Sequence, residues 1–175
     1  RKQAAGFVGA GYPEASEAVA ALIAALDDPR NDDPQPFVWP LRRMGPAGIA
    51  ALRALVEPSP TRDRGIRPVA LSTLLGADPK SKETLDTLIR CLNGDQRDLQ
   101  RSAAEFLKTR GAEARPAVPA LVAALRRADL RECDVYLDTL RALGPAAADA
   151  LPELEAFLAS THASLRPQVQ HLVRT

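Results

Sequence analysis

The chain has 175 residues, of which 46% are hydrophobic and only 4% aromatic, so its interior must be built mainly from aliphatic side chains. Lys and Arg number 23 against 22 Asp and Glu, a net charge of +1 that argues against a dedicated nucleic-acid or anionic-membrane binder. No apolar run approaches the roughly 18–20 residues that cross a bilayer, so we expect no membrane insertion.

Similar helical hairpins repeat along the chain. Each first helix is predicted to end at a glycine, because helices often terminate in a left-handed residue that glycine adopts without strain. These turn glycines are Gly11, Gly45, Gly76, Gly111 and Gly144, spaced 34, 31, 35 and 33 residues apart. The predicted units are residues 1–28, 35–58, 64–94, 98–128 and 132–160, followed by a partial unit at 165–175. Together they predict a single array over residues 1–175.

The second helix of each unit is predicted by apolar residues at positions i, i+3, i+4 and i+7. The clearest examples are Val19, Leu22, Ile23 and Leu26; Leu85, Leu88, Ile89 and Leu92; and Val118, Leu121, Val122 and Leu125. Looser forms are Ile49, Leu52 and Val56 in the second unit and Leu151, Leu154 and Leu158 in the fifth. Pro40 is expected to interrupt the first helix of the second unit.

Two segments share a helix–turn–helix pattern with internal prolines. They are Arg141-Ala142-Leu143-Gly144-Pro145 with Ala150-Leu151-Pro152-Glu153-Leu154, and Arg115-Pro116-Ala117-Val118-Pro119-Ala120-Leu121. With these residues the chain resembles the HEAT-repeat family, in particular its short bacterial, phycobilisome-lyase-like form. The resemblance implies an all-α fold, an α-solenoid in which about five HEAT-like hairpins form a right-handed superhelix. Tetratricopeptide and ankyrin repeats have similar periods, but their signature residues are missing here.

The resemblance extends to the start of one first helix. The family's Asp-x-x-Val-Arg pattern is matched by Asp63 with Ile66-Arg67. In the family this Asp and Arg brace neighbouring repeats, so the resemblance implies a structural role for both residues.

No cluster of residues in the sequence carries catalytic chemistry. His162 and His171 are the only histidines, and neither stands at a zinc-ligand spacing. Nucleophile, phosphate-loop and metalloprotease motifs are absent. Cys91 and Cys133 fall within predicted helices, which favours buried free thiols, although a disulfide between them stays open. We therefore expect no enzyme, no catalytic residue, no cofactor and no metal. Some members of the family that the chain resembles are lyases, but no motif in this sequence matches their functional residues.

The predicted function is a non-catalytic protein–protein interaction scaffold with a curved groove lined by the second helix of each repeat. The candidate partner-binding residues are Arg53, Lys82, Asp86, Arg90, Arg126 and Arg127, together with Trp39. The expected partner is a protein or peptide. Two alternatives stay open: a nucleic-acid-binding HEAT-like protein of the DNA glycosylase type, and a structural spacer in a multidomain protein. The alternating charges of the second helices disfavour the first of these.

We expect the chain to be a segment of a longer protein, because it begins without Met and stops within a helical pattern. A targeting segment can therefore lie outside it. The compartment is left open, with the cytoplasm favoured.

Overall fold

The computed structural model describes residues 14–28, 30–59, 65–129, 132–150, 152–154 and 156. Within these residues the protein is all-α, with eight α-helices, three 3₁₀ segments and no β-strand. The predicted all-α class is confirmed for this part of the chain. The chain divides into two compact units, Arg1–Thr87 and Leu88–Thr175.

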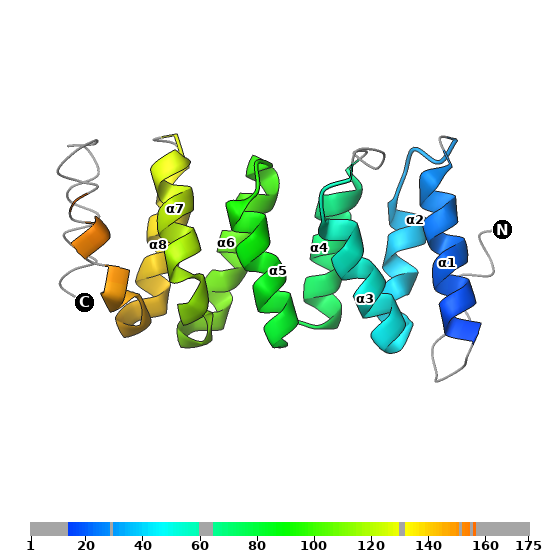
Figure 1. Cartoon of the computed structure of the whole chain (residues 1–175), viewed down its shortest axis with the longest axis horizontal. Coiled ribbons are helices and arrows are strands. Elements are labelled where there is room, and N and C mark those ends of the chain that lie inside the picture. Colours follow the sequence, from blue (N-terminus) through cyan, green and yellow to red (C-terminus); the bar gives the residue numbers. More distant parts are fainter. Residues whose placement is uncertain are drawn as a thin grey trace. The chain divides into compact units, whose positions relative to one another are not determined.

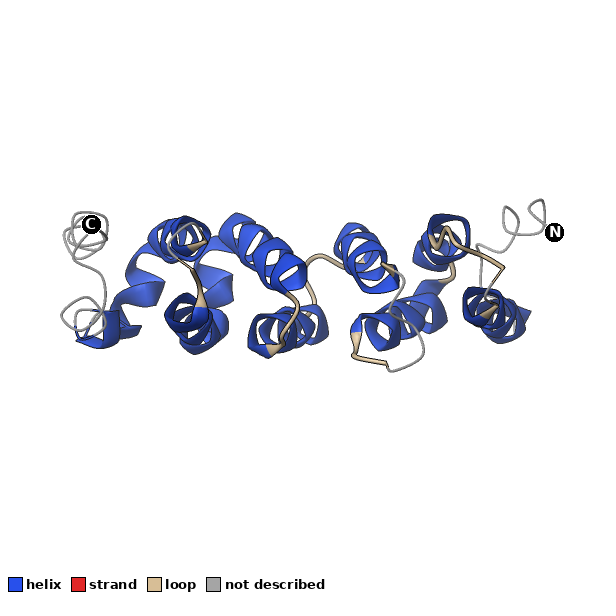
Figure 2. Cartoon of the chain, turned by 90° about the horizontal axis from the view of Figure 1, so that it is seen from above, coloured by secondary structure: helices blue, strands red, loops and turns tan. Residues whose placement is uncertain are grey.

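The first unit is built from two layers of helices. Its elements are α1 (Glu14–Asp27), α2 (Gln35–Val38), the 3₁₀ segment η2 (Trp39–Arg43), α3 (Gly45–Val56) and α4 (Ile66–Ala77). Figures 1 and 2 show α1 and α3 in one layer and α2 and α4 in the other. Contacts run within each layer, from α1 to α3 and from α2 and η2 to α4. Aliphatic side chains fill the interior, among them Leu41, Leu52 and Leu74, none of which is exposed.

Helix α5 (Lys82–Asn93) begins in the first unit and ends in the second. The rest of the second unit consists of α6 (Arg97–Arg110), η3 (Gly111–Ala117), α7 (Val118–Arg127), α8 (Cys133–Leu143) and η4 (Gly144–Ala150). Helices α6 and α8 share one layer, α7 lies in the other, and α8 contacts both (Figure 2). The predicted apolar stripe of α7 is confirmed, with Val118, Leu121, Val122 and Leu125 all buried. The expected free, buried thiols of Cys91 and Cys133 are confirmed as well.

Three of the turn glycines, Gly45, Gly111 and Gly144, have a positive φ that other residues rarely adopt. Gly111 and Gly144 follow α6 and α8 with φ of 55° and 56° and ψ of −134° and −132°. This region is open essentially to glycine alone, so a side chain there is strained even though no atom lies within 4 Å of a β-carbon position. Gly11 lies outside the described residues.

The prediction that a first helix ends at Gly76 is wrong. Helix α4 continues through Gly76 to Ala77, and Gly76 is not among the glycines with positive φ. The reason is a further helical hydrogen bond, in which the amide of Asp78 donates to the Leu74 carbonyl oxygen at 2.8 Å. The turn begins at Asp78, two residues later than predicted.

The second hairpin departs from regular α-helix, as its proline suggested. Helix α2 ends at Val38, two residues before Pro40, and the chain continues as the 3₁₀ segment η2. Helix α3 then packs directly against η2, because a β-carbon added at Gly48 would lie 2.0 Å from the Leu41 carbonyl oxygen. Only glycine permits this backbone approach.

Candidate interaction surface

Arg53 on α3 is committed to contacts inside its own unit. Its Nη2 donates to Asp78 Oδ2 at 2.6 Å and to Ser81 Oγ at 3.1 Å, in the turn between α4 and α5. The Arg53 side chain is 26% exposed, and its Nε is buried without a hydrogen-bond partner. This predicted partner-binding residue therefore braces α3 against the next turn.

The turn that receives Arg53 is itself a hydrogen-bonded cluster. Ser81 precedes the first residue of α5, and its Oγ accepts from the amide of Thr84 at 3.1 Å, as a helix N-cap does. The hydroxyls of Ser81 and Thr84 both donate to Asp78 Oδ2, at 2.6 and 3.2 Å. Burial raises the pKa of Asp78, but these hydroxyls and the Arg53 guanidinium outweigh it and hold the pKa below its ordinary value.

Helix α5 carries three of the predicted residues at helical spacing. Lys82, Asp86 and Arg90 are four residues apart in turn, and all three are exposed. Within the described chain, Lys82 and Asp86 make no hydrogen bond or ion pair. Lys82 and Asp86 belong to the first unit and Arg90 to the second. The α5 surface thus offers one cation and one anion whose charges are not satisfied internally.

The two predicted residues on α7 already have partners. Arg126 Nη1 lies 3.0 Å from Glu153 Oε1, with both side chains about half exposed. Arg127 Nη2 donates to the Leu92 carbonyl oxygen at 2.8 Å, and its Nη1 lies 3.4 Å from the Asn93 carbonyl oxygen. Because those carbonyls end α5, Arg127 serves as a C-terminal cap on that helix.

Trp39 is exposed, in contrast to most large apolar side chains of this protein. It is 55% exposed, and it is the one exposed large hydrophobic side chain in the described part of the chain. Its η2 neighbours Arg42 and Arg43 are also exposed, and neither has a hydrogen bond or ion pair among the described residues. Arg42 and Arg43 are not among the predicted partner-binding residues, although the absence of any Asp or Glu between residues 34 and 56 points to an unbalanced positive charge there.

A hollow lies on the second unit between α6 and α8. Its volume is about 150 Å³, and it is lined by Arg97, Asp98, Arg101, Glu132, Val135 and Tyr136. Ordinary ligand pockets occupy about 300–1,000 Å³, so this one is too small for a typical cofactor. Arg97 is paired with Asp129 and Glu132, and Arg101 Nε with Glu105 at 3.1 Å. Among the charged residues that line the hollow, only Asp98 has no ion pair within the described chain.

The described residues contain no group of three His, Cys, Asp or Glu side chains placed to hold a metal ion. The candidate histidines His162 and His171 lie outside those residues, as do Asp63, Leu151 and Leu158. None of the described helices combines the length and the apolar character needed to cross a membrane.

Of the seven predicted partner-binding residues, the structure leaves Trp39, Lys82 and Asp86 both exposed and unpartnered within the described chain. It engages Arg53, Arg126 and Arg127 in internal contacts. Comparison with protein-family models, with curated proteins and with solved structures finds no match for this chain.

Proposed function

We propose that this chain is a non-catalytic interaction scaffold, built from HEAT-like hairpins that stack as a right-handed α-solenoid. In this proposal the second helices of the repeats form a curved groove for a partner protein or peptide. The exposed and unpartnered charges of Lys82 and Asp86 on α5 are the observation that carries it. They lie on a second helix, where a partner can satisfy them without breaking an internal contact.

Contacts one repeat apart support the stacking of hairpins. Like helices contact like helices inside each unit, α1 with α3, α2 with α4 and α6 with α8. Hydrogen bonds in the second unit join residues 35 or 36 positions apart: Arg127 to Leu92, Thr139 to Ala104 and Tyr136 to Gln100. These separations match the sequence period, as expected when each repeat contacts only its neighbours.

An arginine at the start of α4 gives further support. Arg67 is 9% exposed, and its Nε donates to the Val56 carbonyl oxygen at 2.7 Å. Val56 ends α3 of the preceding hairpin. The bond therefore joins neighbouring hairpins, which is the role that the HEAT resemblance implied for this arginine.

A charge-swap comparison tests the scaffold function. The immobilised chain is used to capture proteins from an extract, and the partners are identified and then rebound in purified form. The variant Lys82→Glu/Asp86→Lys keeps the net charge and the helical spacing of α5 but reverses its charge pattern. Its matched control is Arg101→Glu/Glu105→Arg, which reverses the exposed pair on the first helix α6.

We expect a purified partner to bind the wild type and the α6 control alike and to bind the α5 variant at least about tenfold more weakly. A partner that binds all three equally would contradict a groove on the second helices. If no purified protein binds the chain at all, the scaffold function is wrong and the spacer role replaces it.

A further inference from the structure

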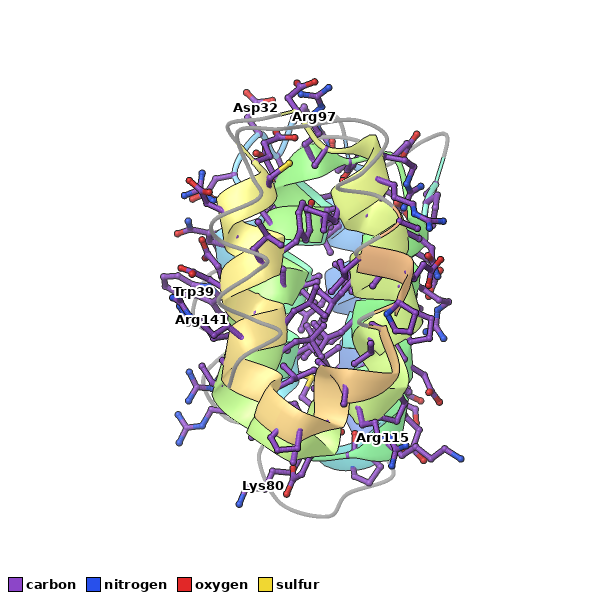
Figure 3. All side chains as sticks on the ribbon, turned by 90° about the vertical axis from the view of Figure 1, so that its left-hand side faces the viewer. Asp32, Trp39, Lys80, Arg97, Arg115 and Arg141 are labelled. Carbon is purple, nitrogen blue, oxygen red and sulfur yellow. The ribbon has the colours of Figure 1, made fainter. Side chains whose placement is uncertain are left out.

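An exposed tryptophan, Trp39, lies on the first-helix side of the first unit. Figure 3 shows the Trp39 side chain projecting away from the interior of its unit. Tryptophan is among the residues most enriched at the energetic centres of protein interfaces. Single exposed apolar side chains are nevertheless common, so whether Trp39 marks a binding site depends on the residues around it.

The surroundings of Trp39 are cationic and unpaired. In the described chain, every Lys and Arg has a hydrogen bond, an ion pair or another electrostatic or ring contact except Arg42, Arg43 and Lys82. Two of those three follow Trp39 within the same 3₁₀ segment. Because residues three apart in a 3₁₀ helix lie one above the other, Arg42 is on the same side as the indole.

Neither arginine is paired with an acid in the described chain. Residues 34–56 and 65–77 contain no Asp or Glu, and they include α2, η2, α3 and α4 in full. Helix α4 packs against both α2 and η2. Asp32 lies toward the end of the helical layer in Figure 3, whereas Trp39 lies midway along it. The positive charge of Arg42 and Arg43 is therefore not balanced by any carboxylate on α2, η2, α3 or α4, although α1, which also contacts α2, carries Glu17 and Asp27.

We infer that Trp39, Arg42 and Arg43, the tryptophan–arginine surface, dock an acidic segment of a partner protein. Partner carboxylates accept hydrogen bonds from the two guanidinium groups, whose planar geometry suits carboxylates, while an apolar side chain of the segment packs against the indole. The inference rests on the proposed scaffold function and adds to it a second contact and the charge of the partner.

A peptide fits this surface better than a nucleic acid does. Single-stranded nucleic acids are held by a row of aromatic platforms and a basic groove that follows the backbone. Here there is one platform with two cations, on a chain whose net charge is +1. Two charge contacts and one apolar contact are instead the scale of a short linear segment.

Trp39 is the only tryptophan in the chain, so its fluorescence reports on this surface directly. The probe is a tryptophan-free peptide of about 12 residues in which Glu and Asp alternate with Leu and Phe. We expect saturable binding with a blue shift of the emission, because the peptide removes water from the indole. The same peptide with Gln and Asn in place of the acids is expected to bind at least about tenfold more weakly.

The variant Arg42→Gln/Arg43→Gln keeps the tryptophan and is expected to lose at least about tenfold in affinity for the acidic peptide. Lys108→Gln removes an exposed cation from α6 in the second unit and is expected to bind the peptide within about twofold of the wild type. Circular dichroism of each variant shows whether the helical fold is retained. Because both arginines are exposed and unpartnered, we expect it to be unchanged.

Three results would overturn the inference. The first is no saturable change in fluorescence up to about 1 mM peptide, and the second is equal binding by Arg42→Gln/Arg43→Gln. The third is tighter binding of oligothymidine of the same length, which would assign the surface to nucleic acid. If the acidic peptide fails these tests but the α5 charge swap still weakens the binding of a purified partner, only this inference is wrong and the scaffold function is retained.

Discussion

The guanidinium of Arg127 caps the C-terminal end of α5, donating from Nη2 to the carbonyl oxygen of Leu92, 35 residues earlier, at 2.8 Å. The last carbonyls of a helix lack partners within it, and a positive charge there also opposes the negative end of the helix dipole. We predict that Arg127→Met lowers the free energy of unfolding by about 1–2 kcal/mol, as measured by urea denaturation.

The neighbouring arginine supplies the control for that measurement. Arg126 contacts Glu153 through an ion pair whose side chains are about half exposed. Such pairs contribute little, so Arg126→Met should change the free energy of unfolding by less than about 0.5 kcal/mol. Equal losses for the two variants would show that the cap on α5 contributes no special stability.

Gly144 and Gly76 have different backbone conformations, so substitution by alanine is expected to change stability in opposite directions at the two positions. Gly144 has φ of 56° and ψ of −132°, so Gly144→Ala should destabilise the fold by about 1–3 kcal/mol through backbone strain alone. Gly76 lies within α4 with open space at the β-carbon position, so Gly76→Ala should stabilise the fold by about 0.5–1 kcal/mol. Thermal and urea denaturation measure both, and a stabilising Gly144→Ala would contradict the described turn.

The cluster around Asp78 predicts a pH dependence of stability. Its pKa in the folded protein lies below the ordinary value of 3.8, so the folded state binds its proton less readily than the unfolded chain does. The stabilisation is therefore fully present above the unfolded pKa and is lost as the pH falls through the folded pKa. We predict that Asp78→Asn destabilises the protein at pH 7 and that its difference from the wild type shrinks below about pH 4.

Asp86→Asn is the matched control for the pH experiment, because Asp86 is exposed and makes no hydrogen bond or ion pair in the described chain. Urea denaturation at several pH values compares the three proteins. A constant difference between Asp78→Asn and the wild type from pH 7 down to about pH 2.5 would argue against the stabilised carboxylate.

The two thiols predict slow chemical modification. Cys133 is fully buried and Cys91 is 4% exposed. Burial raises the pKa of Cys133, and the nearby carboxylate of Asp134 raises it further, which lowers the thiolate fraction. With a disulfide reagent at pH 8 we expect both thiols to react at least about 100-fold more slowly in the native protein than in urea. Rapid labelling of either thiol in the native state would mean that its helix is not packed as described.

Much of the helical architecture could be predicted from the sequence, because burial repeats with the helical period. Val118, Leu121, Val122 and Leu125 stand at the spacing of one helix face, and all four are buried. The residue at which α4 ends was harder to predict from the sequence, because a glycine marks the end of a helix only if its φ is positive. Whether Gly76 or Asp78 ends the helix depends on the amide of Asp78, which forms one more helical bond.

The availability of the charged residues could not be predicted from helical phase. Arg53, Lys82 and Arg127 all stand at polar positions of second helices, yet only Lys82 is left unpartnered. The partners of the two arginines lie 25 to 35 residues away, so their pairing depends on tertiary packing. Trp39 poses a similar problem, because an apolar segment rich in proline is compatible with either a core or an exposed position.

The direct backbone contact between Gly48 and Leu41 limits how this hairpin can evolve. A β-carbon at position 48 would approach the Leu41 carbonyl oxygen to 2.0 Å, and a backbone atom cannot turn aside as a flexible side chain can. The contact fixes where the backbone of Leu41 passes α3, two residues after Trp39 in the same 3₁₀ segment. The exposed residues of η2, such as Trp39, can therefore be exchanged during evolution, whereas position 48 must remain glycine.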